Sequence, residues 1–451
     1  MNRSLRLALR LALATGCLWS PRAHANAASL LGYGARDSAL AASDVADADP
    51  AAAATVNPAF AWRPGVRLLA GYGYGSMRLR ISGRDAGVRD VSGTDLALQI
   101  GSALDHAGKV ALGGGLTLHI PDAYQARVFF RAPTEPSFPL YDSPPQRTVF
   151  DVALAFRYHA LSLGVGASVL AGTSGRGADF ILAQDANGTF ADSRTDIALP
   201  IAAAPTAGLA LELGRLAIAG RLRAPLSLGV AVETEAYLAV HGNPFNGHTD
   251  VDAFGESAYE PLTLDLGARA DLTPALRVFA DVTYTRWSAA PPPSATITLD
   301  LDLVTNPSEL EARFTAPRFR DTLSPHLGLE LRVLELPRGA LEPRRRAPIS
   351  DDERGPPRLA LRAGWTVSPS PVPRQTGLTS YADSTRNVFA LGAGYCFGRA
   401  WGIELTSDVA LAYHRLARRD FDKGSDVLPN AHYRASGDIY AAALTFGAAW
   451  R

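Results

Sequence analysis

Few residues in this 451-residue chain have the types and spacing that catalysis requires. An esterase or phospholipase needs a Ser–His pair with a third group that orients the imidazole, whereas the nine histidines here are scattered. The Gly-Tyr repeat at 71–75 is followed by no Lys-Ser or Lys-Thr pair, so it is no phosphate-binding loop. No metal-ligand spacing appears. We therefore expect no enzymatic activity, no catalytic residue, no metal and no cofactor.

Three arginines are candidates for binding a carboxylate. Arg221, Arg277 and Arg362 lie on the polar side of segments in which apolar and polar residues alternate. A guanidinium can hold a carboxylate through two parallel hydrogen bonds. The favoured alternative is that such arginines form ion pairs with neighbouring segments, and the sequence alone does not separate the two roles.

Two backbone motifs are candidates for moving parts. Asn57-Pro58-Ala59 is either a turn or part of a gate, because Asn-Pro is a common turn dipeptide. Gly113-Gly114-Gly115 interrupts a strand-like segment. Glycines inside a strand mark either a bend or a close approach of other backbone, and we keep both interpretations.

The first residues have the pattern of a secretory signal peptide. Arginines precede an apolar run from Leu11 to Trp19, and Ala23-His24-Ala25 offers a small-residue cleavage site. We expect residues 1–25 to be removed, leaving Cys396 as the one cysteine and no disulfide. A lipoprotein signal ending at Cys17 is the weaker rival.

The overall composition excludes several classes of protein. Lys plus Arg and Asp plus Glu both number 44, so no basic excess points to nucleic acid. No apolar run after the signal reaches the ~20 residues that a membrane helix needs. Short alternating segments continue to the last residue instead.

Alternation with a period of two predicts antiparallel strands throughout the mature chain. At the C-terminus, Tyr440, Leu444 and Phe446 alternate with Ala441, Thr445 and Gly447. A soluble sandwich would alternate too, so connection lengths must decide. We expect about fourteen strands, near 66–81, 94–104, 108–120, 147–159, 161–173, 196–212, 215–231, 259–270, 275–287, 313–333, 357–368, 386–397, 401–414 and 437–451.

The connections alternate between short and long, as they do in outer-membrane β-barrels. Tight turns at 105–107, 213–214, 271–274 and 398–400 are separated by long loops at 121–146, 174–195, 232–258, 288–312, 369–385 and 415–436. Residues 334–356 break this rule and form a charged periplasmic insertion, either a tolerated loop or a docking segment. The fold class is therefore all-β, a transmembrane antiparallel barrel over residues 64–451.

Residues 26–63 precede the barrel and do not read as a strand. The stretch 35–46 predicts a short helix, and Pro50 and Pro58 end it. The segment is too short to fold alone, and a barrel of about fourteen strands is wide enough to leak. We therefore expect this segment to plug the lumen.

The mature sequence resembles the FadL/TodX family of outer-membrane transporters for hydrophobic compounds. Gly34-Ala35-Arg36, Asp49-Pro50 and Asn57-Pro58-Ala59 match the family's N-terminal hatch pattern in order. Segments with matching strand motifs follow in the same order, at 112–121, 259–288, 321–333, 359–373 and 387–398. The chain departs from the pattern in the insertion 334–356 and in ending on Arg451.

The resemblance implies an outer-membrane protein that takes up long-chain fatty acids or aromatic hydrocarbons passively. It implies hatch movement at Asn57, Pro58 and Ala59 and lateral exit near Gly113, Gly114 and Gly115. Partners would be the hydrophobic substrate, outer-membrane lipid with lipopolysaccharide, and the barrel assembly machinery, with a monomer as the default. The alternative is a structural or adhesive plugged barrel with no transport. A continuous apolar pocket between residues 26–63 and the wall would favour transport, and polar filling would oppose it.

Overall fold

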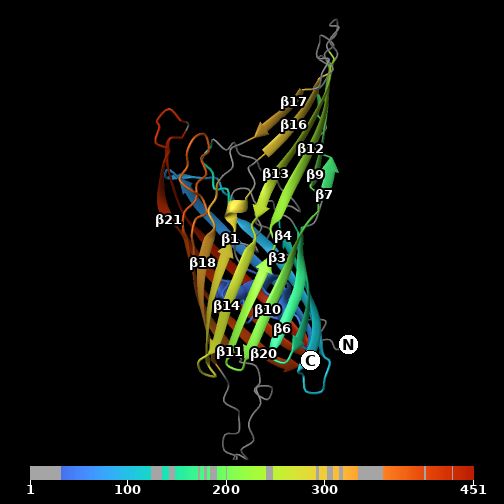
Figure 1. Ribbon diagram of the computed structural model, residues 1–451, viewed down its shortest axis with the longest axis vertical. Helices are drawn as coiled ribbons and strands as arrows, with labels where there is room; N and C mark the ends of the chain where they lie inside the picture. Colours follow the sequence, from blue (N-terminus) through green and yellow to red (C-terminus); the bar gives the residue numbers. More distant parts are fainter. Residues whose placement is uncertain are drawn as a thin grey trace, which may run out of the picture.

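Fourteen antiparallel strands close into a barrel in the computed structural model (Figure 1). In chain order these are β1 (Gly65–Ile81), β3 (Val91–Ala103), β4 (Val110–Pro121), β5 (Val149–Tyr158), β6 (Leu161–Leu170), β10 (Ala202–Leu213), β11 (Leu216–Arg223), β14 (Thr263–Asp271), β15 (Leu276–Thr285), β18 (Thr322–Val333), β19 (Leu359–Ser368), β20 (Arg386–Ala400), β21 (Ile403–Asp422) and β22 (His432–Trp450). Each strand pairs with its neighbours in this order, and β1 pairs with both β3 and β22 to close the barrel. The short β2 (Arg84–Asp85) pairs with β1.

The structure describes most of the chain from residue 32 onward. The described residues are 32–122, 135–141, 148–170, 173–176, 180–182, 190–199, 201–239, 247–290, 294–301, 308–313, 318–333, 359–400, 403–428 and 430–450. The expected signal peptide and the insertion 334–356 lie outside them, so both stay predictions. Among the described residues, no helix is long and apolar enough to cross a membrane.

Alternation along each strand gives the barrel an apolar outside and a polar inside. On β18 the exposed side chains include Leu327, Leu329 and Leu331, whereas His326 and Glu330, which alternate with them, are buried. Successive side chains on a strand point to opposite faces, so this period of two separates the two environments. The outward apolar surface fits lipid, as in barrels that cross a membrane.

The two ends of the barrel differ in their connections. Tight turns such as Gly214-Arg215 and His159-Ala160 join strands at one end, which we call the turn end. Long connections leave the other end, which we call the loop end. There the 3₁₀ helix η2 (Trp287–Ala289) follows β15.

A second sheet of seven strands lies beyond the loop end (Figure 1). Its members are β7 (Thr173–Arg176), β8 (Phe180–Leu182), β9 (Phe190–Leu199), β12 (Leu226–Ala239), β13 (Gly247–Glu260), β16 (Ser294–Leu301) and β17 (Ser308–Arg313). The sequence interpretation assigned most of these residues to loops, and that was wrong. Strands that have left the lipid need no apolar outer face, so the alternation that identifies barrel strands is weak in them.

The N-terminal segment, residues 32–64, lies inside the barrel. It contains α3 (Gly34–Ala39), α4 (Ala53–Val56) and the 3₁₀ helix η1 (Pro58–Phe60). Helix α3 packs against β19 to β22 and β1, α4 packs against β4 and β5, and η1 packs against β5, β6 and β10. These contacts reach opposite sides of the wall, so the segment crosses the lumen. The helix expected over 35–46 ends at Ala39, because Ala41 and Ala42 adopt positive φ angles of 51° and 58°.

Candidate functional site

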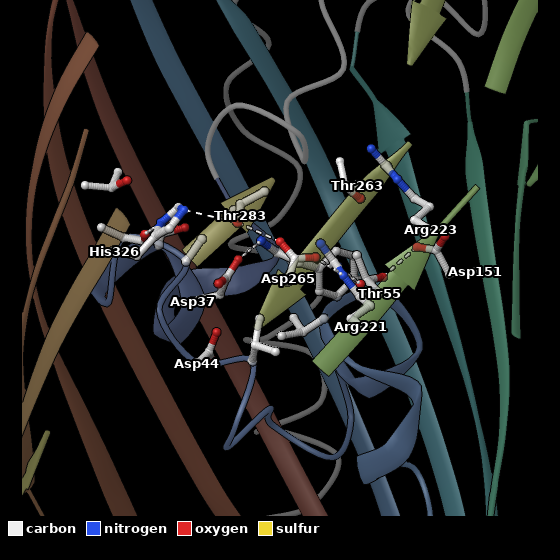
Figure 2. A pocket seen from close by; sticks show the side chains of 18 of the residues that line it. Asp37, Asp44, Thr55, Asp151, Arg221, Arg223, Thr263, Asp265, Thr283 and His326 are labelled. Carbon is white, nitrogen blue, oxygen red and sulfur yellow. Dashed lines mark hydrogen bonds and ion pairs between the residues drawn. The ribbon is translucent and has the colours of Figure 1, made fainter. Parts of the chain in front are cut away.

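A cavity of about 300 Å³ lies between the N-terminal segment and the loop-end part of the wall (Figure 2). We call it the lumenal cavity. The N-terminal segment forms its floor with residues that include Asp37, Asp44 and Thr55. Ten or more barrel strands contribute its wall, because each strand turns every second side chain inward.

Charged and hydroxyl side chains occupy much of the cavity wall. Arg221 Nε donates to Asp265 Oδ2 at 2.8 Å and Arg221 Nη1 donates to the Thr55 carbonyl at 2.6 Å. The Thr55 hydroxyl donates to Asp151 Oδ2 at 2.6 Å (Figure 2). Arg223 lies 2.9 Å from a carboxylate oxygen of Glu260. The sequence-based criterion of a continuous apolar pocket is therefore not met.

Apolar side chains line only parts of the cavity. Val149, Leu170 and Leu226 form one patch, and Val388 with Ala412 forms another. Ala412 also packs against an apolar cluster under the loop end, which we call the mouth cluster. Its members include Met77, Leu79, Phe138, Tyr141, Val372, Tyr381, Leu416, Phe421, Tyr433 and Ile439. Buried apolar packing thus continues from the barrel mouth to one side of the lumenal cavity.

Asp47 fastens the N-terminal segment to the wall below the cavity. Its carboxylate contacts Arg36 at 2.8 Å, Arg269 at 2.9 Å, Arg63 at 3.9 Å and also Arg277. Burial alone would raise the pKa of this carboxyl, but the surrounding guanidiniums outweigh burial and hold the pKa below its usual range. Asp47 is therefore an anion that joins the segment to β14 and β15.

The three predicted arginines all make ion pairs. Besides Arg221, Arg277 contacts Asp47 and Asp271, and Arg362 contacts Glu330 and Asp408. Of the three, Arg221 alone lines the lumenal cavity. These contacts match the structural alternative of the sequence interpretation, and a ligand role for Arg221, Arg277 or Arg362 stays a prediction.

Asn57 holds the turn between α4 and η1. Its side chain is fully buried; Nδ2 donates to the Val45 carbonyl at 2.9 Å, and Oδ1 accepts from Ala59 N at 3.1 Å. Pro58 and Ala59 rest on β6 and β10 so closely that a Cβ at Gly164 would lie 2.3 Å from the Pro58 carbonyl carbon. The motif thus has a clear turn role, and its gate role is a prediction.

The three glycines of β4 belong to an unbroken ladder. Gly113, Gly114 and Gly115 pair with 101 to 99 of β3 and with 155 to 153 of β5, without a register shift. A Cβ at Gly113 would lie 2.3 Å from the Ala61 carbonyl oxygen. Close packing against the N-terminal segment therefore explains Gly113, and lateral opening remains a prediction.

Several residues of the site were not identified from the sequence. Asp44, Asp47, Arg386 and His414 each fall within a segment whose neighbours are partly apolar or Ala-rich, so nothing local distinguishes them. A contact between residues 47 and 277 depends on how the segment crosses the lumen. The one available indication was alternation along their segments, which places the side chains of Arg386 and His414 on the inward face. Within the described residues, no group of His, Cys, Asp and Glu side chains is arranged to hold a metal ion.

No protein-family model and no curated protein matches the sequence. Solved structures do resemble the fold. A Pseudomonas aeruginosa FadL homologue is 15% identical, with a TM-score of 0.54 over 96% of this chain and 99% of that chain. The P. putida toluene transporter TodX is 16% identical, with a TM-score of 0.55 over 94% and 99%.

The CymD monoaromatic hydrocarbon channel is 13% identical, with a TM-score of 0.52 over 92% of this chain and 97% of that chain. Likeness at such identities concerns the fold, and it agrees with the family resemblance of the sequence motifs. This chain therefore has the barrel fold of the solved FadL homologue and of the TodX and CymD channels.

Proposed function

We propose that this chain is an outer-membrane channel for passive uptake of small hydrophobic or amphipathic solutes, with the N-terminal segment as its gate. The observation that carries the proposal is the enclosed segment itself. It crosses the lumen of a barrel with an apolar exterior and leaves a ligand-sized cavity on the loop side. A gate in this position would separate an outer binding space from the turn end.

The likeness to hydrocarbon channels supports the solute class. The similar solved structures include a toluene transporter and a monoaromatic hydrocarbon channel. The mouth cluster is a second apolar region, whose buried aromatic rings belong to a cluster that meets the lumenal cavity at Ala412. Lipopolysaccharide obstructs apolar solutes, and in this proposal the mouth cluster opens to admit them.

Release from the cavity requires the gate to move. In this proposal the turn at Asn57, Pro58 and Ala59 shifts away from β6 and β10, and the solute passes between the segment and the wall. Lateral exit beside Gly113, Gly114 and Gly115 is the second route, and it needs the β3–β4 ladder to open. A signal peptide cleaved near Ala25 and insertion by the barrel assembly machinery belong to the same proposal.

A plugged barrel without transport is the second candidate. The polar floor of the cavity and the ion pairs around Asp47 favour it, because both hold the segment in place. Structural or adhesive barrels need no mobile segment. The two candidates therefore differ in whether solute crosses the membrane.

Uptake measurements in whole cells separate these candidates. A host that lacks its own transporter is given this chain, and radiolabelled oleate or toluene is followed into the cells. Transport predicts faster uptake than in the same host with an empty vector, provided that heat-modifiable gel migration shows a folded barrel. Equal rates with and without the folded protein would contradict transport of these solutes and favour the plugged barrel.

A further inference from the structure

On the outer face of β21, the surface changes from apolar to cationic within a few residues near the loop end. Leu411 is 63% exposed, and the next two residues on the same face are Tyr413 and Arg415. The ring of Tyr413 lies 5.4 Å from that of Tyr440 on β22, and we call these two residues the tyrosine pair. Aromatic side chains mark the edge of the apolar band in membrane barrels, so Arg415 lies just outside that edge.

Four exposed arginines lie on this side of the barrel, and we call them the arginine patch. They are Arg78 and Arg80 on β1 and Arg415 and Arg418 on β21. The residues beside them in sequence, Met77, Leu79 and Leu416, are buried in the mouth cluster. Because successive side chains on a strand point to opposite faces, the arginines point away from the lumen. A register shift after Leu416 leaves Arg418 exposed as well.

The patch has two halves on either side of β22. Asp438 of β22 is the register partner of both Arg78 and Arg415. Two strand spacings separate these arginines by about 10 Å across the sheet. Arg80 lies beyond Arg78 on the same face, and Arg418 lies beyond Arg415. Two anionic groups of one molecule can therefore each meet a pair of arginines.

Arginines outnumber carboxylates between the tyrosine pair and the ion pair of Arg434 with Asp420. Seven arginines and four aspartates in this region, all of them described, leave a net charge of +3: Arg78, Arg80, Arg84, Arg89, Arg415, Arg418 and Arg434 against Asp85, Asp90, Asp420 and Asp438. Farther out, Asp422 and Asp426 contact His432. The positive excess is therefore a band beside the tyrosine pair.

Other tyrosines on the outer face lie beside carboxylates instead. The Tyr284 hydroxyl donates to Asp321 at 2.6 Å, and the Tyr72 hydroxyl donates to Asp122 at 2.6 Å. The positive band thus belongs to one side of the barrel and does not follow merely from leaving the membrane. Exposed pairs with aspartate are weak, so they leave the arginines able to bind a stronger anion.

The ligand that fits this surface has acyl chains and more than one phosphate. Exposed leucines below the tyrosine pair, such as Leu411 and Leu444, require hydrocarbon, whereas the arginines above it require an anion. Guanidinium groups bind phosphate oxygens through paired, charge-assisted hydrogen bonds. Lipid A, the membrane anchor of lipopolysaccharide, carries two phosphates directly above its acyl chains.

We propose that the arginine patch binds the two phosphates of lipid A, with the tyrosine pair against the upper part of its acyl chains. Arg78 and Arg80 serve one phosphate, and Arg415 and Arg418 serve the other. The inference rests on the outer-membrane placement in the proposed function and does not require transport.

Four lipids test whether the phosphates are recognised. They are lipid A with two phosphates, monophosphoryl lipid A, fully dephosphorylated lipid A and dioleoylphosphatidylglycerol, each added to the purified mature protein in detergent and followed by native mass spectrometry. We expect the affinity to fall in the order two, one and no phosphates, by about tenfold or more overall. Phosphatidylglycerol or dephosphorylated lipid A binding as tightly as lipid A overturns the proposal.

Charge substitutions test whether the patch is the site. The double variant Arg78→Gln with Arg415→Gln weakens lipid A by about tenfold or more and leaves the dephosphorylated form unchanged. Asp438→Asn removes the carboxylate between the two halves and tightens lipid A by about threefold. A variant that merely disturbed folding would not strengthen binding, and heat-modifiable gel migration checks that each barrel is folded.

The matched control removes the same charge at the other end of the barrel. Lys109→Gln with Arg215→Gln changes two exposed cations in the tight turns and leaves the affinity for lipid A unchanged. Arg286→Gln, beside Asp321 on the far side of the loop end, is the control at the level of the patch. Equal weakening by the patch variant and either control overturns the proposal.

Toluene uptake by whole cells distinguishes this inference from the channel function. Lipid A binding that responds to the patch variants, without toluene uptake, supports the patch and contradicts the channel. Toluene uptake by a protein that binds all four lipids equally overturns the patch and leaves the channel in place.

Discussion

At the residue scale, one carboxylate connects the N-terminal segment to the barrel. Asp47 faces four guanidiniums, of which Arg269 and Arg277 belong to the wall. Removing one partner from a buried ion cluster leaves the remaining charges without compensation, which costs roughly 3–5 kcal/mol. Asp47 therefore has a much larger role than exposed carboxylates such as Asp426.

We predict that Asp47→Asn loosens the N-terminal segment while the barrel stays folded. Limited proteolysis of the purified protein should cleave within residues 32–64 faster than in the wild type, and the urea midpoint should fall. Asp426→Asn is the control, since its pairing with His432 is fully exposed to solvent and contributes little to stability. Unchanged cleavage in Asp47→Asn would show that the ion cluster does not hold the segment.

Asp383 provides a second prediction at this scale, in the connection between β19 and β20. The carboxyl is 1% exposed, and its burial raises its pKa from 3.8 to about 6. A carboxyl with a raised folded-state pKa binds its proton more tightly when folded. The stability that protonated Asp383 contributes to the folded state is therefore fully present below pH 3.8 and is lost as pH rises through about 6.

We expect this connection to be held more firmly at pH 5 than at pH 8, by an amount on the order of 1 kcal/mol, because pH 5 lies only about one unit below the folded-state pKa of about 6. Protease cleavage within 369–385 measures it, because Asp383 packs there beside the mouth cluster. Asp383→Asn keeps the shape and removes the titration, so its cleavage should be slow at both pH values after correction for protease activity. A pH difference that persists in Asp383→Asn would assign it to another group.

At the element scale, the N-terminal segment is either a gate or a fixed plug, and a reversible cross-link decides between them. A Cβ at Gly115 on β4 would lie 3.7 Å from the Ala54 Cβ on α4, within the 3.5–4.5 Å typical of disulfides. In a Cys396→Ser background, we predict that the oxidised pair Ala54→Cys and Gly115→Cys lowers solute uptake to the empty-host rate. Reduction should restore uptake.

The single variant Ala54→Cys is the control for the two substitutions, and its uptake should not respond to oxidation. Mass spectrometry of the mature chain confirms that the bond has formed. Full uptake with the bond intact would exclude movement of α4 away from β4 as the gating step and leave lateral opening elsewhere in the wall.

The same scale shows what the sequence could and could not predict. Each of the fourteen barrel strands was located, because lipid on one face and the polar lumen on the other impose alternation along every strand. Strand 215–231 was drawn too long, since Ala224-Pro225 separates β11 from β12. The contacts within the site were harder to predict from the sequence than the strands were. The pairing of Arg362 with Glu330 follows from adjacent strands, but that of Asp47 with Arg269 requires the path of the segment through the lumen.

At the scale of the whole molecule, the outer surface determines where the protein resides. Leu391 in the middle of β20 is 65% exposed, and Leu213 at the turn end of β10 is 53% exposed. Their similar exposure would give similar effects in water. In a bilayer they differ, because the midplane excludes charge far more strongly than the interface.

We therefore predict that Leu391→Arg destabilises the barrel in lipid vesicles by about 2–4 kcal/mol, whereas Leu213→Arg costs about 0–1 kcal/mol. Urea titration of the vesicle-inserted protein, read by heat-modifiable gel migration, measures both. The hydrocarbon centre would have to solvate a guanidinium at 391, but the side chain at 213 can reach the headgroups. Equal costs for the two substitutions would mean that the exposed leucines face a uniform solvent, and the membrane-spanning interpretation of the barrel would be wrong.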